Sequence, residues 1–380
     1  MKIVIAIDSF KGSLTSLEAG NAAKAGILRV FHDAEVLVRP LADGGEGTVD
    51  ALVSGMGGTL QTVLASDPLG RKIPCKYGII DQTAVIEMSA AAGITLLTDT
   101  ERNPLYTTTY GVGEIILDAI EKGCREFIIG IGGSATNDGG IGMLQALGFD
   151  FLDAEGKQIS FGAQGIAHLS KIDGAHIRKE LAECLFFIAC DVSNPLCGEE
   201  GCSAVYSPQK GATPAMIKEM DESLANYAAL AAVTYPRADK DYPGAGAAGG
   251  MGFAFLSFLG ARLVPGVELI VSKTNLEKAM TGADVVITGE GRLDGQTAMG
   301  KAPIGVASLA KKHGIPVLAF AGGVTKDAVL CNEKGIDAFF PIVRGVTTLD
   351  EAIKKENAHA NLRDAVEQAF RLLKAAKTIK

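Results

Sequence analysis

Residues 1–28 have the sequence MKIVIAIDSFKGSLTSLEAGNAAKAGIL, and this stretch decides the fold class. Residues 2–7 are rich in Ile and Val, with no polar residue after Lys2, a pattern typical of a strand covered on both faces. Thr15 and Glu18 form a capping box, which predicts a helix from this point to Leu28. A strand that leads into a helix is the repeating unit of a parallel α/β sheet, so this class is predicted.

The same alternation returns at the other end of the chain. Strands are predicted at 285–287, 317–320 and 338–340, and helices at about 299–312 and 359–375. The middle of the chain differs, because strand-like periodicity with turn signals fills residues 59–88. A mixed sheet with helices accommodates this pattern.

The α/β fold is therefore predicted to contain two domains. Residues 1–66 plus 283–380 would form a Rossmann/flavodoxin-like domain with a parallel sheet. Residues 67–282 would form an inserted α/β domain with a mixed sheet. The length of 380 residues suits two domains of about 100–200 residues each.

The charge balance argues against one class of function. The chain has 36 Lys and Arg against 44 Asp and Glu, a formal charge of −8, whereas nucleic-acid binding needs clustered cations. The N-terminal apolar run stops at Asp8, too early for a signal peptide or a membrane span. The odd number of cysteines, seven, without metal-binding spacing favours reduced thiols. We therefore expect a cytoplasmic protein with no nucleic-acid or membrane partner.

Many of the 47 glycines gather in loops that follow predicted strands. In parallel α/β sheets ligands bind beyond the carboxyl ends of the strands, where such loops converge. The first loop, DSFKGS at 8–13, carries Lys11, which would contact a phosphate or stay in solvent. The second, DGGEGT at 43–48, places Asp43 and Glu46 among glycines, which suits Mg²⁺ or a polyol, with a helix cap as the alternative.

The third loop, GIGGSATNDGG at 130–140, follows an apolar strand. Gly130, Gly132 and Ala135 match a dinucleotide fingerprint, with Asp150 at the expected separation. In that fingerprint, however, the helix begins within the glycines, whereas here polar residues and further glycines follow. A longer loop that cradles a polyphosphate therefore fits better.

The fourth loop begins with Asp191, directly after the predicted strand 185–189. A carboxylate at a strand end is placed to act as a general base or a metal ligand, and capping of a plain turn is the alternative. A Ser-His-Asp hydrolase is disfavoured, because the sequence contains no GxSxG elbow and no histidine at catalytic spacing.

The fifth loop, at 288–302, contains acidic and cationic residues ahead of a helix. Its GxxxxGK pattern is not a true phosphate-binding P-loop, because Ala302 stands where that motif needs Ser or Thr. Arg292 and Lys301 could hold a phosphate or a carboxylate, and Asp294 could hold Mg²⁺ or the reacting hydroxyl. A solvated polar loop is the alternative.

These loops closely resemble those of the bacterial glycerate kinases of the type-1 family. The resemblance covers essentially the whole chain in order, and it rests on DSFKG at 8–12, DGGEGT at 43–48, GGSATNDGG at 132–140, DVSNPL at 191–196, PGAGAAGG at 243–250 and TGEG at 288–291. It implies ATP-dependent phosphorylation of D-glycerate, with 2-phosphoglycerate favoured over 3-phosphoglycerate, in glyoxylate and aldarate breakdown. It also implies two α/β domains with the active site in the cleft between them.

The resemblance supplies no residue roles, so we assign them from the needs of phosphoryl transfer, which are positioning and charge neutralisation. The predicted site comprises catalytic Asp191 and Lys11; substrate-binding Ser9, Asp43, Glu46, Arg292 and Lys301; nucleotide-phosphate-binding Gly132, Gly133, Ser134, Thr136 and Asn137; and metal-binding Asp138 and Asp294. ATP and Mg²⁺ are the predicted cofactors, and D-glycerate is the predicted small-molecule partner.

Three alternatives stay open. The first is the same reaction with 3-phosphoglycerate as product. The second is an NAD-dependent hydroxy-acid oxidoreductase that uses the dinucleotide fingerprint. The third is a non-catalytic sensor that binds a sugar acid through the same loops. The oligomeric state also stays open, with a homodimer as one alternative.

Overall fold

The structure, a computed structural model, describes residues 1–42, 44–45 and 47–376. Contacts divide the chain into two compact units: the first lies within 1–43, 50–57 and 267–380, and the second within 44–49 and 58–266. The predicted boundaries, 1–66 plus 283–380 and 67–282, differ from these at both junctions. Residues 59–66 lie with the second unit because they pair along their whole length with the strand 72–80.

The first unit contains a parallel sheet in the order β13-β12-β11-β1-β2. Its elements are β1 (Lys2–Ile7), α1 (Ser16–Leu28), β2 (Glu35–Val38), α11 (Leu276–Met280), β11 (Val285–Leu293), η4 (Thr297–Met299), α12 (Ala302–Lys312), β12 (Val317–Val324), η5 (Lys326–Val329), α13 (Leu330–Glu333), β13 (Ala338–Pro341), α14 (Leu349–Ala352) and α15 (Lys355–Ala376). Two helices, α2 (Thr48–Met56) and α10 (Gly266–Lys273), span the boundaries between the units.

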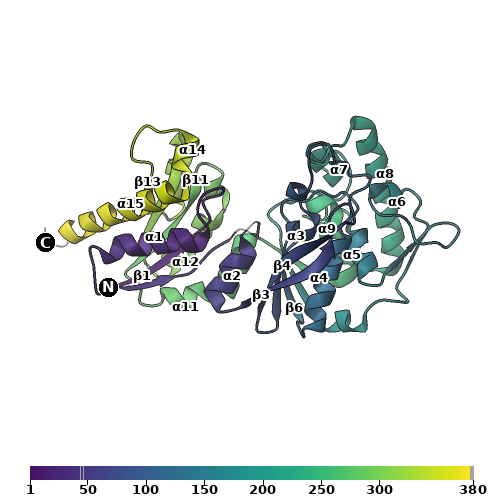
Figure 1. Ribbon diagram of the computed structural model, residues 1–380, viewed down its shortest axis with the longest axis horizontal. Coiled ribbons are helices and arrows are strands. Elements are labelled where there is room, and N and C mark those ends of the chain that lie inside the picture. The colour runs from purple at the N-terminus through teal and green to yellow at the C-terminus, as the bar shows by residue number, and fades with distance from the viewer. Residues whose placement is uncertain (43, 46, 377–380) are drawn as a thin grey trace. The chain divides into compact units, whose positions relative to one another are not determined.

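Both faces of this sheet are covered, as the apolar sequence of β1 predicts. Ile3 and Ile5 belong to a core cluster that includes residues of α1 and α15. Val4 and Ala6, whose side chains point to the other face, are also fully buried. Figure 1 shows α1 and α15, from opposite ends of the chain, lying side by side, and α12 contacts β1, β11 and β12.

The second unit contains a mixed sheet in the order β10-β9-β6-β5-β4-β3. Its elements are β3 (Thr59–Ser66), β4 (Lys72–Ile80), β5 (Thr83–Glu87), α3 (Ser89–Ala92), η1 (Ile94–Leu96), α4 (Tyr110–Glu121), β6 (Glu126–Gly130), α5 (Ile141–Ala146), β7 (Asp150–Leu152), α6 (Ala163–Ile166), β8 (Lys171–Asp173), η2 (Lys179–Glu183), β9 (Leu185–Ala189), α7 (Cys202–Tyr206), η3 (Pro208–Lys210), α8 (Pro214–Thr234), α9 (Ala247–Leu259) and β10 (Arg262–Val264).

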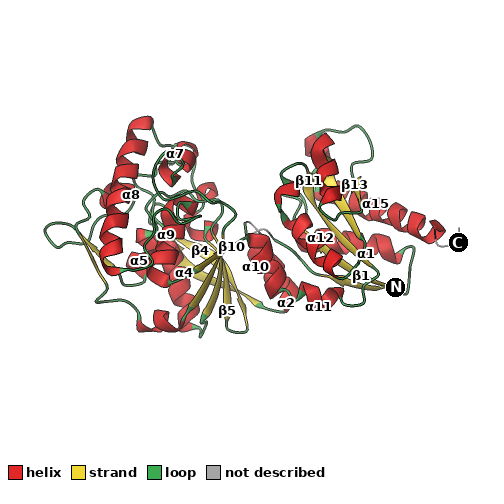
Figure 2. Cartoon of the chain, turned by 180° about the vertical axis from the view of Figure 1, so that it is seen from behind, coloured by secondary structure: helices red, strands yellow, loops and turns green. Residues whose placement is uncertain are grey.

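The direction of the strands changes within this sheet. The pairs β5–β6, β6–β9 and β9–β10 are parallel, whereas β3–β4 and β4–β5 are antiparallel. The carboxyl ends of β5, β6, β9 and β10 therefore meet at one edge, and the loops that follow them gather there. Figure 2 labels β4, β5 and β10 of this sheet together with α4, α5 and α9 of the same unit. The predicted fold class, α/β with a parallel and a mixed sheet, is confirmed.

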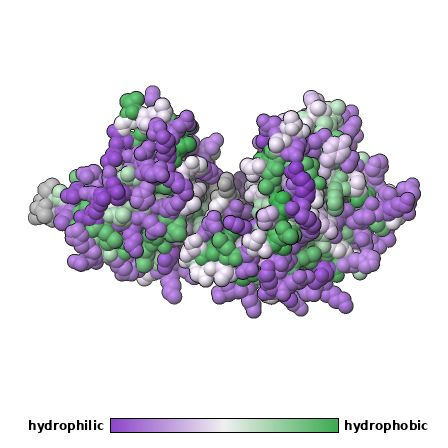
Figure 3. Space-filling view, viewed as in Figure 1, coloured by the Kyte–Doolittle hydropathy of each residue, from purple (hydrophilic) through white to green (hydrophobic). Residues whose placement is uncertain are grey.

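The surface is mainly hydrophilic on the face shown in Figure 3. A helix with the length and apolarity to cross a bilayer is not found in the described part of the chain.

Candidate active site

The segment at Gly44 passes very close to the strand ends at the edge of the second unit, and glycine residues make this approach feasible. A Cβ atom on Gly130, at the end of β6, would lie 2.0 Å from the carbonyl oxygen of Gly44. A Cβ atom on Gly44 would in turn lie 2.4 Å from Cβ of Ala189, at the end of β9. The second, third and fourth predicted loops are therefore neighbours, although Asp43 and Glu46 themselves lie outside the described residues.

The loop after β6 has an accessible half and an enclosed half. Gly132 and Gly133 are exposed and Ser134 is half-buried, whereas Thr136 and Asn137 are fully buried. The Asn137 amide nitrogen donates a hydrogen bond of 2.9 Å to Ser203 Oγ inside the protein. Of the predicted phosphate-binding residues, only the first three are therefore placed to touch a ligand directly. Thr136 and Asn137 support the loop from behind.

Asp138, a predicted metal ligand, lies inside the protein. Its carboxylate accepts hydrogen bonds from the backbone N–H of Thr109 at 2.8 Å and from those of Gly140 at 3.1 Å and Gly142 at 3.3 Å. Thr109 Oγ1 donates to the same carboxylate at 2.8 Å. Burial raises the pKa of Asp138, while these hydrogen bonds lower it. The contacts favour a structural role at the starts of α4 and α5, and the metal role stays a prediction.

Lys210, which the sequence analysis did not select, is buried beneath this loop. Its side-chain ammonium donates hydrogen bonds to Ser134 Oγ at 2.7 Å and to the Thr136 carbonyl oxygen at 2.6 Å. Desolvation lowers the pKa of Lys210 to about 8. The sequence offered only a weak signal, a lysine two residues after a proline and directly before a glycine. The contact itself could not be predicted, because it joins residues 76 positions apart.

Asp191 lies exposed at the end of β9, as predicted. One of its carboxylate oxygens, Oδ1, accepts a hydrogen bond of 2.9 Å from the backbone N–H of Gly266, beyond the end of β10. This bond fixes the carboxylate between two parallel strand ends, where it can accept a further hydrogen bond from a ligand. The position suits a residue that orients a hydroxyl, and the catalytic role stays a prediction.

The first unit has its own cluster, at the carboxyl ends of β1 and β11. Ser9 is half-buried and Lys11 is exposed in the loop after β1. A Cβ atom on Gly291 would lie 3.6 Å from Cα of Phe10, so the backbone of β11 runs close to this loop. The first and fifth predicted loops are therefore neighbours.

Glu290, also not selected from the sequence, is a half-buried carboxylate of this cluster. It accepts a hydrogen bond of 2.6 Å from Thr297 Oγ1. Burial raises the pKa of Glu290, and the negative charge of Asp294 acts in the same direction, whereas Lys301 and Lys11 lower it. The predicted residues Lys11, Asp294 and Lys301 therefore lie close enough to Glu290 to act on its charge. The TGEG sequence, which follows the predicted strand 285–287 and lies within β11 in the structure, was the signal that could have identified it.

Asp294 and Arg292 lie at the rim of the same cluster. Asp294 Oδ1 accepts a hydrogen bond of 3.1 Å from the backbone N–H of Thr297, which starts η4. Arg292 Nε lies 3.7 Å from Asp294 Oδ2, and the Arg292 side chain is largely exposed. The guanidinium is therefore held loosely and is available to an anionic ligand.

A preformed metal cage is not seen in the described ranges, which contain no group of three or more His, Cys, Asp or Glu side chains arranged to hold a metal ion. Mg²⁺ is usually bound by one or two carboxylates plus substrate phosphates. Asp294, with Glu290 nearby, therefore fits an ion that arrives with a nucleotide. Asp138 and Asp294 belong to different units, and the predicted meeting of both clusters in one cleft stays a prediction.

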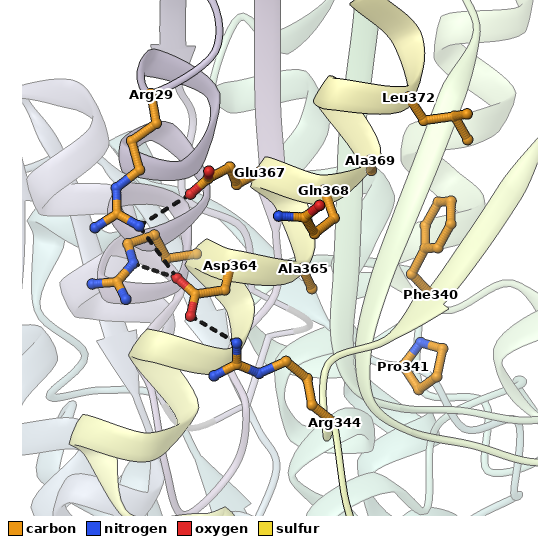
Figure 4. Close-up of a pocket in the computed structure, with 11 residues that line it drawn as sticks. Arg29, Phe340, Pro341, Arg344, Asp364, Ala365, Glu367, Gln368, Ala369 and Leu372 are labelled. Atoms are coloured by element: carbon orange, nitrogen blue, oxygen red, sulfur yellow. Dashed lines mark hydrogen bonds and ion pairs between the residues drawn. The ribbon is translucent and has the colours of Figure 1, made fainter. Parts of the chain in front are cut away.

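A separate pocket of the first unit lies between α15 and β13 (Figure 4). Its arginines are already paired with carboxylates: Arg29 lies 3.1 Å from Glu367, and Arg344 lies 2.8 Å from Asp364. The residues that line it include none of the predicted site residues. Arg363 also lies 2.7 Å from Asp364, so all three arginines of the pocket are already engaged by its two carboxylates.

Asp150, which the dinucleotide alternative needs, lies elsewhere. It belongs to β7, and its carboxylate lies 2.6 Å from His176 Nδ1, an interaction that raises the pKa of His176. Ala135, of the same fingerprint, is buried. These positions do not support nicotinamide binding through this motif.

The two strand-end clusters, rich in glycine, hydroxyl, carboxylate and cationic groups, are typical of α/β enzymes that act on phosphorylated ligands. Comparison with known proteins gives the family. The model of the glycerate kinase family matches residues 3–374, and the chain belongs to this family of phosphotransferase enzymes.

Individual relatives agree with this assignment. The chain is 47% identical over 356 residues to a protein named glycerate 2-kinase from Escherichia coli K12, covering 93% of each chain. It is 46% identical over 375 residues to a glycerate kinase from Haemophilus influenzae, covering 98% of this chain and 99% of the relative. A crystal structure of a protein assigned as glycerate kinase 2 from Salmonella typhimurium LT2 superposes with a TM-score of 0.92 at 45% identity, covering 100% of this chain and 99% of the other.

Proposed function

We propose that the protein transfers the γ-phosphoryl group of ATP to the 2-hydroxyl of D-glycerate, giving 2-phospho-D-glycerate and ADP, in glyoxylate or aldarate breakdown. The observation that carries this proposal is the family match along residues 3–374. The choice of the 2-hydroxyl is supported by the name of the Escherichia coli relative, glycerate 2-kinase.

The cluster in the second unit suits the nucleotide phosphates. Gly132 and Gly133 are exposed, and glycines let a backbone approach a phosphate closely. Ser134 adds a hydroxyl group beside them. Asp191, fixed by the Gly266 N–H, would orient the substrate hydroxyl and accept its proton.

The cluster in the first unit suits the charges of the reaction. Lys11 would neutralise the transferring phosphoryl group, and Arg292 or Lys301 would hold the carboxylate of glycerate or a phosphate, while Ser9 would bind a substrate hydroxyl. Mg²⁺, held by Asp294 and the nucleotide, would supply charge neutralisation at the phosphates. Asp138 as a second metal ligand, and Asp43 and Glu46 as substrate-binding residues, stay proposals.

A coupled assay of ADP release with ATP, Mg²⁺ and D-glycerate tests this function. Steady ADP release that requires D-glycerate is the expected result. NAD-dependent oxidation of glycerate without any ADP release would instead support the oxidoreductase, and glycerate binding without turnover would support the sensor.

The role of Asp191 is tested by Asp191→Asn, which removes the negative charge but keeps the shape of the side chain. Turnover should fall by at least about 100-fold, the usual contribution of general acid–base catalysis, with thermal unfolding unchanged. Asp350→Asn, at an exposed helical carboxylate, is the matched control and should keep full activity. Unimpaired turnover of Asp191→Asn would exclude the role.

A further inference from the structure

Lys210 is a cation enclosed in the second unit. It ends η3, which lies between α7 and α8 in the chain, and only 1% of its surface is exposed. Gly211 follows in a left-handed conformation, with φ of 94°, and a Cβ atom there would lie 2.2 Å from the carbonyl oxygen of Arg102. The turn therefore packs closely against the segment at Arg102, and the hydrogen bonds of Lys210 to Ser134 and Thr136 join it to the loop that follows β6.

The contacts of Lys210 determine how Ser134 can bond. The lysine ammonium has only donors, so Ser134 Oγ is the acceptor in their 2.7 Å hydrogen bond. The hydroxyl of Ser134 still has its own proton to donate, and a hydrogen bond donated by this hydroxyl is not found among the described residues. Ser134 is half-buried and follows the exposed Gly132 and Gly133, so its free donor lies where the loop reaches solvent.

The electrostatics of the loop favour an anion at this point. A buried ammonium is costly unless negative charge is near. The charged and titratable groups that act on Lys210 are Asp138 and Cys202. The Asp138 carboxylate is already hydrogen-bonded to Thr109, Gly140 and Gly142. Lys210 hydrogen-bonds only to a hydroxyl and a carbonyl oxygen, so the positive charge of Lys210 is only partly balanced.

We propose that Lys210 is a positioning residue that orients the Ser134 hydroxyl as a donor to an anionic group of a substrate, either a nucleotide phosphate or the carboxylate of glycerate. The proposal deepens the proposed kinase function and rests on it. Lys210 acts through Ser134 and supplies positive charge from behind the loop without touching the ligand. Its lowered pKa agrees with a cation that a bound anion would stabilise.

The test compares Lys210→Met, Lys210→Arg, Ser134→Ala and the double variant Lys210→Met/Ser134→Ala in steady-state kinetics. KM is measured separately for ATP and for D-glycerate, together with kcat. Lys210→Met and Ser134→Ala should raise KM for the same substrate by about tenfold or more, as expected for loss of a hydrogen bond to a charged group. The double variant should be no worse than the poorer single variant, and Lys210→Arg should recover part of the loss.

The substrate affected identifies the anion: a rise in KM for ATP assigns the phosphate, and a rise for D-glycerate assigns the carboxylate. Lys218→Met, at an exposed lysine of α8, is the matched control and should leave both values unchanged. Additive effects of the two substitutions, or unchanged KM in Lys210→Met, would overturn the proposal.

A pH profile provides a readout that a purely structural lysine would not move. As the pH rises through about 8, Lys210 loses its proton, so KM of the affected substrate should rise in the wild-type protein. In Ser134→Ala, which should keep its thermal stability, this rise in KM should be smaller, because only the charge of Lys210 then acts on the anion. An undiminished rise in KM in Ser134→Ala would count against the proposal. These pH measurements use only the wild-type protein and Ser134→Ala, so they test the proposal even if Lys210→Met does not fold.

The failure of the kinase function and the failure of this proposal give different results. If the wild-type protein shows no ADP release with D-glycerate, the kinase function fails. The affinity for ATP of the wild-type protein and of Ser134→Ala, measured by calorimetry, then tests whether Ser134 binds an anion. Weaker binding in Ser134→Ala supports it, and equal binding refutes it.

Discussion

Replacement of Asp138 separates a structural carboxylate from a metal ligand. In Asp138→Ala the backbone N–H groups of Thr109, Gly140 and Gly142 lose their acceptor inside the protein. A buried donor left without an acceptor costs about 1–3 kcal/mol, so these groups together should lower the free energy of unfolding by about 3 kcal/mol or more. Asp138→Asn retains one oxygen and should cost less, about 1–2 kcal/mol.

The assay is urea unfolding followed by far-UV circular dichroism, because the chain contains no tryptophan for fluorescence. The Mg²⁺ concentration needed for half-maximal activity is measured on the same variants. Asp294→Asn is the comparison: it should raise the Mg²⁺ requirement with little loss of stability. If Asp138→Asn instead unfolds like the wild-type protein and raises the Mg²⁺ requirement tenfold, the structural interpretation is wrong and the metal prediction is supported.

Three further experiments examine the close approach at Gly130, the ionisation of Glu290 and the binding of nucleotide. Gly130→Ala places a Cβ atom 2.0 Å from the Gly44 carbonyl oxygen, so thermal stability and activity should both fall. Gly345→Ala is the control, because open space surrounds this position, and it should change neither property. Equal melting temperatures for the two variants would contradict the close approach. Glu290 lies near Asp294, the proposed Mg²⁺ ligand, so the rate should increase as Glu290 ionises. Because burial raises the pKa of Glu290, this ionisation should produce an acidic limb of the pH–rate profile at higher pH than an ordinary carboxyl group would. Glu290→Gln should remove that limb, and an unchanged limb would exclude this residue as its source. Mg·ATP at 100 times its Kd should stabilise the protein by about 2.7 kcal/mol in thermal unfolding while NAD gives no shift; stabilisation by NAD alone would revive the dinucleotide alternative.

The local features of the fold could be predicted from the sequence. The capping box of Thr15 and Glu18 starts α1 as expected, because both of its hydrogen bonds lie within four consecutive residues. The apolar pattern of β1 likewise identified a strand buried on both faces. The membership of β3 was not predictable in the same way, since it depends on pairing with β4 and not on the sequence of β3 alone.

The candidate site was predictable as loops but not as individual contacts. Glycine-rich strand ends identified the segments around Gly132 and Asp191, because parallel sheets bring such ends to one edge. The enclosed positions of Thr136 and Asn137 depend on the packing of distant segments, as does the contact between Lys210 and Ser134, 76 positions apart. A polar side chain has the same letter whether it faces a ligand or the interior, so the sequence alone does not distinguish these two positions.

The proposed reaction places the new phosphate on the 2-hydroxyl of D-glycerate. The most direct measurement is NMR of the product formed from ATP, Mg²⁺ and D-glycerate, in which coupling between phosphorus and the carbon-bound hydrogens locates the new phosphate. A phosphate coupled to the single hydrogen on C2 is predicted. A phosphate coupled to the two hydrogens on C3, or no phosphorylated glycerate at all, would contradict the claim.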